Sequence, residues 1–145
     1  MSKSHKTSFI GQMTINRQSY AQIVRWSAAN FEINLLCFGK KSHIELVARV
    51  RNVSRSPVWF AEWNEREVRF IRKKMAKLGF DLVATGHSHA AKNSYPHPSP
   101  MDIKWCTKNS IELIAFPLLG RVRVWKIRTT MEKTLDSEIE LLVLR

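Results

Sequence analysis

The sequence predicts a mixed α/β fold in which a curved β-sheet is flanked by helices. Apolar runs typical of strands recur along the whole chain, and two stretches between them carry apolar residues at helical spacing instead. A length of 145 residues with 44% hydrophobic content supports one core and leaves no room for a second. We therefore expect a single domain over residues 8–145, preceded by a basic, polar tail at residues 1–7.

The amino-terminal third is predicted to hold a strand, a helix and two central strands. The first strand is expected at 8–15, and the helix after it has an apolar face made of Tyr20, Ile23, Val24 and Ala28. An almost wholly apolar run at 33–38 is typical of a buried strand. After a turn at 39–42, residues 43–50 are its predicted partner.

The second helix is the most clearly marked element. Asn64 followed by Glu67 is typical of a capping box, and Gly79 supplies the stop. The apolar stripe between them consists of Val68, Ile71, Met75 and Leu78. The opposite, basic stripe is expected to be a solvated helix face, and its residues are Arg66, Arg69, Lys73 and Lys77.

The remaining strands are predicted at 80–89, 110–116, 121–127 and 138–144. The long irregular stretch at 90–100 directly follows two histidines. An irregular stretch of that length within a compact domain is usually functional. We therefore expect this stretch to form part of a functional site.

Net charge is the strongest compositional signal. Twenty-four Lys and Arg against 12 Asp and Glu give +12, which attracts anionic partners at low salt. Weak nucleic-acid binding, an acidic protein surface and plain solubility all stay open. No apolar run approaches the roughly 18 residues of a membrane span, so we expect no membrane partner and a cytoplasmic location. Cys37 and Cys106 lie among apolar neighbours and are expected to be buried thiols.

Two short motifs on either side of the irregular stretch are suited to one metal ion. His87 and His89 stand two residues apart at a strand end, so both imidazoles point to one face, although a polar strand end is an equally good reading of this pair alone. Downstream, Ser99 and Pro100 are typical of a helix start that presents Asp102 in its first turn. Two nitrogens and one oxygen leave a fourth position for water, which is the open pattern of catalytic zinc.

This combination resembles the JAMM family, the zinc isopeptidases and peptidases of the MPN domain. The family pattern is an upstream Glu, then His-x-His, then Ser-x-x-Asp, and the matching stretches here are 31–39, 82–89 and 98–103. The resemblance implies an MPN/JAB fold of the cytidine-deaminase-like type. Two departures concern the loop: Ala90 stands where the family usually has Pro, and the segment from His89 to Ser99 is longer than usual.

The resemblance also assigns roles. It implies one Zn²⁺ held by His87, His89 and Asp102, with Glu32 as the general base and Ser99 as a hydrogen-bond donor to the oxyanion. The alternative for Glu32 is an exposed carboxylate at a helix-to-strand junction, and for Ser99 a helix cap. Cys106 could be taken for a nucleophile but is more often a core residue in such a setting.

The implied function is zinc-dependent hydrolysis of a peptide or isopeptide bond. The implied substrate is a ubiquitin-like or sulfur-carrier-like modifier joined through its carboxyl terminus. The alternative function is a noncatalytic or DNA-associated MPN-type binding domain, motivated by the net charge and by Arg121 and Arg123 on one strand face.

Overall fold

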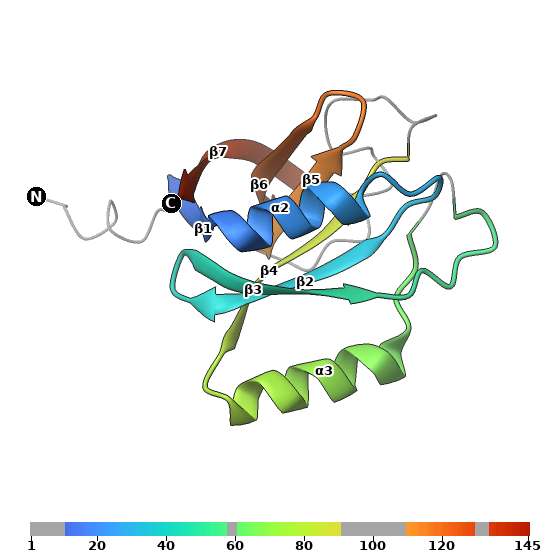
Figure 1. The fold of residues 1–145 in the computed structure, drawn as a ribbon, viewed down its shortest axis with the longest axis horizontal. Coiled ribbons are helices and arrows are strands. Elements are labelled where there is room, and N and C mark those ends of the chain that lie inside the picture. The colour runs from blue at the N-terminus through green and yellow to red at the C-terminus, as the bar shows by residue number, and fades with distance from the viewer. Residues whose placement is uncertain (1–10, 58–60, 91–109, 130–133) are drawn as a thin grey trace, which may run out of the picture.

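The computed structural model describes residues 11–57, 61–90, 110–129 and 134–145 (Figure 1). The predicted tail at 1–7 lies outside these residues. Along the chain, the described elements are β1 (Gln12–Asn16), α2 (Arg17–Trp26), β2 (Asn34–Lys40), β3 (His43–Val50), α3 (Glu65–Lys77), β4 (Asp81–Ser88), β5 (Ser110–Phe116), β6 (Arg121–Thr129) and β7 (Thr134–Leu144).

The strands form a closed barrel in the order β1-β3-β2-β4-β5-β6-β7. β1 closes it, because this short strand pairs in parallel with β3 on one side and with β7 on the other. The prediction of a mixed α/β fold, with a curved sheet flanked by helices of the cytidine-deaminase-like type, is therefore wrong. The sheet has no open edge between β1 and β7, and the described residues contain two helices against seven strands.

The closure has a simple physical reason. An open sheet would leave the backbone groups of its two edge strands without hydrogen-bond partners, and pairing those edges removes both of them. Here residues 12–16 of β1 pair with residues 140–144 of β7, near opposite ends of the sequence. Local periodicity contains no information about a pairing over that distance, so the sequence predicted the strands but not the barrel.

The main core lies within the barrel and under α2. Asn16 caps α2, since its side chain accepts a hydrogen bond from Ser19 N at 2.8 Å. Ile23 is buried and Tyr20 packs against the core, as predicted, whereas Val24 is exposed on the helix and Ala28 is exposed beyond the helix end at Trp26. The buried core residues are Met13, Ile15, Ile23, Ile33, Leu35, Cys37, Ile44, Ala84, Leu113, Ala115, Val122, Val124 and Ile139.

α3 forms a separate layer against the outer side of β2 and β3 (Figure 1). Its cap is the predicted one: Asn64 Oδ1 accepts from Glu67 N at 3.1 Å, and Gly79 takes a φ of +87° after the helix. The Glu67 carboxylate accepts from Arg51 N at 2.9 Å, which ties the start of α3 to the end of β3. Leu78 is 63% exposed, so the apolar stripe of the helix ends at Met75.

Candidate metal centre

The two histidines lie where β4 ends. His87 belongs to β4, and His89 continues its parallel pairing with β5 by donating its backbone N–H to Ala115 O at 2.9 Å. The extended backbone places side chains two residues apart on one face. The two ring centroids are 5.3 Å apart, with an interplanar angle of 40°. Both side chains are buried, and His89 is 0% exposed.

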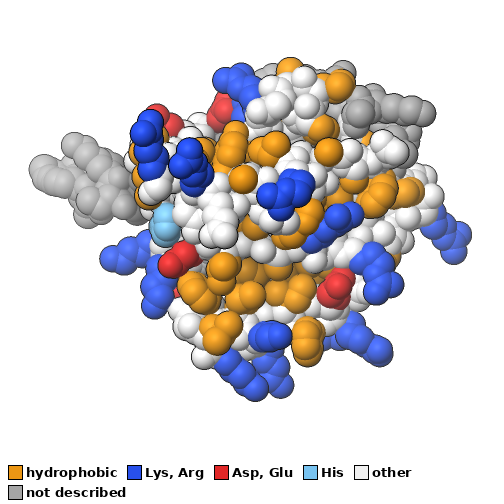
Figure 2. Space-filling model, in the orientation of Figure 1, with side chains coloured by type: hydrophobic (Ala, Val, Ile, Leu, Met, Phe, Trp, Pro, Cys, Tyr) orange, Lys and Arg blue, Asp and Glu red, His pale blue; other side chains and the backbone are white. Residues whose placement is uncertain are grey.

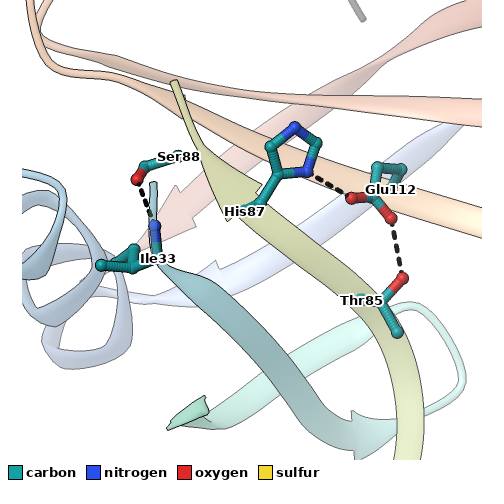
Figure 3. A network of polar contacts seen from close by, with 5 residues as sticks. All are labelled: Ile33, Thr85, His87, Ser88 and Glu112. Atoms are coloured by element: carbon teal, nitrogen blue, oxygen red, sulfur yellow. Dashed lines mark hydrogen bonds and ion pairs between the residues drawn. The ribbon is translucent and has the colours of Figure 1, made fainter. Parts of the chain in front are cut away.

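His87 is held by a buried carboxylate that sequence reasoning missed. Its Nδ1 lies 2.7 Å from Glu112 Oε2, and Thr85 Oγ1 donates to Glu112 Oε1, also at 2.7 Å (Figure 3). In the parallel register of β4 and β5, Glu112 is paired with Thr85, and His87 lies two residues further along β4 on the same face. The signal that could have found it is a lone acid within the otherwise apolar strand β5.

This arrangement selects one tautomer of His87. An ionised carboxylate only accepts hydrogen bonds, so the Nδ1 of His87 carries the proton and donates it to Glu112. The lone pair then lies on Nε2. Histidines that bind metals commonly have this partner on the other ring nitrogen, because it orients the ring and makes the ligand more basic. The donor set at His87 therefore fits a metal ligand.

Ser88 joins the histidine strand to the segment that carries Glu32. Ile33 N donates to Ser88 Oγ at 3.0 Å, and Ser88 N donates to Ile33 O at 3.0 Å (Figure 3). In this antiparallel pairing Asn34 is opposite His87. The same register, continued past Ile33 and Ser88, sets position 32 opposite position 89.

Glu32 is buried, with 1% of its surface exposed, rather than the exposed carboxylate considered as its alternative. Its backbone is fixed on both sides. Glu32 N donates to Pro57 O at 2.6 Å, and Asn52 Nδ2 donates to Glu32 O at 2.8 Å. Glu32 thus lies just before β2, and hydrogen bonds hold its backbone next to the histidine strand β4.

An apolar cluster backs the histidines. The His89 and Phe116 rings are nearly perpendicular with their centroids 5.0 Å apart, and the Phe116 and Trp125 centroids are 6.0 Å apart. Phe116 and Trp125 belong to a buried cluster with Ile114 and Ile127. Such surroundings exclude water and strengthen each polar interaction in the site.

The rest of the predicted site lies outside the described residues. This holds for the third predicted ligand Asp102, for Ser99, and for His97 and Cys106, which were weighed and set aside. Among residues 11–57, 61–90, 110–129 and 134–145, no three His, Cys, Asp or Glu side chains gather closely enough to hold a metal ion. The described part therefore contributes two histidines and their support.

Cys37 is a buried free thiol, as predicted. Burial raises its pKa, and the negative charge of Glu112 raises that pKa further. At neutral pH the thiol is protonated, which makes Cys37 a core residue rather than a nucleophile.

The basic strand face on β6 is partly neutralised. Arg123 donates to the Glu138 carboxylate through Nε at 2.7 Å and through Nη2, and its guanidinium lies 5.2 Å from the Trp125 ring centroid. The hydrogen bond to Glu138 and that residue's charge raise the pKa of Arg123, against the opposing effect of burial. One of the two arginines behind the DNA-binding alternative is therefore engaged within the protein.

Solved structures of other proteins have a similar fold. A protein from Desulfitobacterium hafniense, solved in solution, matches with a TM-score of 0.75 and 20% identity over 92% of this chain and 93% of that chain. A JAB1/MPN domain protein from Archaeoglobus fulgidus matches with a TM-score of 0.58 and 19% identity over 92% of this chain and 100% of that chain. No protein-family model matches the sequence, and no curated protein sequence matches it. The chain thus shares an MPN-like fold with the archaeal protein.

Neither described helix has the length and apolar character needed to cross a membrane.

Proposed function

We propose that this chain is a zinc-dependent hydrolase that cleaves a peptide or isopeptide bond. The observation that carries the proposal is the buried 2.7 Å contact between His87 Nδ1 and Glu112, which leaves Nε2 of His87 as a ligand atom. The fold shared with a JAB1/MPN domain protein supports it, because the sequence motif resembles the metallopeptidases of that domain.

The proposed zinc ligands are His87, His89 and Asp102. His87 and His89 come from the end of β4, and Asp102 would come from the segment that follows. Zinc bound there would supply a Lewis acid that activates a water molecule for attack on a carbonyl carbon. Glu112 keeps the His87 ring oriented, and the apolar cluster under His89 keeps bulk water away.

Glu32 is the proposed general base. Its carboxylate would take a proton from the attacking water and later deliver it to the leaving amine, and the burial of Glu32 supports this role. The backbone contacts to Pro57 and Asn52 hold Glu32 at one position during these two transfers. Ser99 is proposed to donate a hydrogen bond to the oxyanion.

The proposed substrate class is a ubiquitin-like or sulfur-carrier-like modifier, joined through its carboxyl terminus and processed in the cytoplasm. This class follows from the family resemblance alone. The DNA-associated alternative stays a prediction from net charge, and the engagement of Arg123 by Glu138 gives it no added support.

Cleavage of fluorogenic isopeptide and modifier-coumarin substrates tests the proposal. Zinc-loaded wild-type protein is expected to release the fluorophore, to lose this activity with a chelator, and to regain it when zinc is restored. Glu32→Gln keeps the shape of the side chain and removes the base, so this variant is expected to bind zinc but to release no fluorophore. A folded, zinc-loaded protein that cuts none of several modifiers would overturn the proposal.

A further inference from the structure

A hollow lies between the segment before β2 that carries Glu32 and the end of β3. Its volume is about 380 Å³, within the range of small ligand pockets, and it is lined by Phe31, Ile33, Arg49, Val50, Arg51 and Asn52. Phe31 and Ile33 are the two chain neighbours of Glu32, and Asn52 donates to the Glu32 carbonyl at 2.8 Å. The hollow is therefore lined by the two chain neighbours of the proposed general base and by the side chain that holds its backbone carbonyl.

Two guanidinium groups give the hollow its chemistry. Arg49 and Arg51 stand two positions apart at the end of β3, both are exposed, and neither forms an ion pair with a carboxylate in the described part of the chain. The Arg49 guanidinium lies over the Phe31 ring, 5.8 Å from its centroid. The backbone of Arg51 is fixed by the Glu67 carboxylate at 2.9 Å. The Arg49 guanidinium is thus held over a ring, whereas for Arg51 it is the backbone that is held.

Arginine pairs of this kind bind carboxylates well. The planar guanidinium offers parallel N–H donors that match the two oxygens of a carboxylate, and a ring beneath it restricts its motion. Binding of nucleic acid needs a longer run of phosphate contacts than two arginines supply. Figure 2 shows basic side chains, with a few acidic ones among them, around a hydrophobic band on the face that carries α2 and α3, and the net charge of +12 favours an acidic partner.

We propose that the hollow is an anion subsite, in which Arg49 and Arg51 bind the carboxylate of an Asp or Glu side chain of a peptide substrate. The identification of the ligand as a substrate rests on the proposed function. The subsite would make the enzyme prefer peptide substrates that carry an acidic side chain.

Binding of labelled peptides to metal-free protein tests the subsite without using activity. Three fluorescent nonapeptides that differ only in a central Glu-Glu, Gln-Gln or Lys-Lys pair are titrated by fluorescence anisotropy at low salt. Wild type is expected to bind the Glu peptide about tenfold more tightly than the Gln peptide. Arg49→Glu and Arg51→Glu are expected to lose this preference and to favour the Lys peptide.

Arg128→Glu is the matched control, since Arg128 is exposed on β6 outside the hollow and the charge change is the same. It is expected to keep the preference for Glu. An equal loss in all three variants would show general charge attraction, and a preference that survives in both hollow variants would exclude the subsite. A single-stranded oligonucleotide that binds more tightly than the Glu peptide, and is released by the same two variants, would assign the hollow to nucleic acid and overturn the proposal.

A cleavage assay with the same peptides separates the two proposals. Acid-dependent binding without any cleavage would retain the subsite and refute the hydrolase. Cleavage with equal kcat/KM for the Glu and Gln peptides would retain the hydrolase and refute the subsite.

Discussion

Glu112 offers the sharpest test of how the histidines are prepared for metal. Glu112→Gln keeps the size of the side chain and an acceptor oxygen, but it removes the charge that faces His87 Nδ1 at 2.7 Å. Glu112 is 7% exposed, so water does not replace the lost interaction. Loss of such an outer carboxylate weakens metal binding about tenfold to hundredfold, which corresponds to about 1.4 to 2.7 kcal/mol.

Competition against a chromophoric zinc chelator at pH 7 measures this change directly. Glu45→Gln is the matched control, because Glu45 is exposed on β3 and its side chain is far less constrained. Thr85→Val removes the other hydrogen bond to Glu112 and is expected to have a smaller effect. Glu112→Ala is less informative, since it removes the acceptor of two buried donors and destabilises the fold by about 1–3 kcal/mol. Wild-type zinc affinity in folded Glu112→Gln would refute the role given to Glu112.

Three further predictions concern the base, the packing and the thiol. Glu32→Gln is expected to retain zinc and its melting temperature while losing at least a hundredfold in kcat, and more than a tenth of wild-type activity would contradict the general-base role. Gly86→Ala would set a Cβ 2.5 Å from Leu113 O between β4 and β5, so a clear drop in melting temperature is expected, and an unchanged value would show that the strands can separate. Cys37 has a pKa raised above its ordinary value of 9.0, so its protonated form stabilises the fold below that value and the contribution is lost as the pH rises above it. Peptide mapping after alkylation at pH 8 should find Cys37 unmodified until denaturant is added, and rapid native labelling would refute its burial.

Much of the secondary structure could be predicted from local patterns. The bounds of β3 and β5 were predicted as observed, and those of β6 and β7 only needed extension. The α3 cap at Asn64 followed from residue chemistry alone. Each of these features depends on side chains within a few residues of one another, which is the range over which periodicity and capping act.

Features that depend on distant pairing could not be predicted. Barrel closure needs β1 beside β7, and the contact of His87 with Glu112 needs the parallel register of β4 and β5. Glu32 was singled out by a family resemblance, and its burial became visible only with the pairing of Ile33 and Ser88. The hollow at Arg49 and Arg51 likewise forms between β3 and the chain before β2.

The central claim is that the end of β4 carries a zinc site. Zinc content by mass spectrometry tests it most directly, on untagged wild type beside His87→Ala, His89→Ala and Asp102→Ala, each checked for folding by circular dichroism. The account predicts close to one zinc per wild-type chain and loss of zinc in all three variants. A folded wild type that contains no zinc and takes up none when it is added would contradict the account.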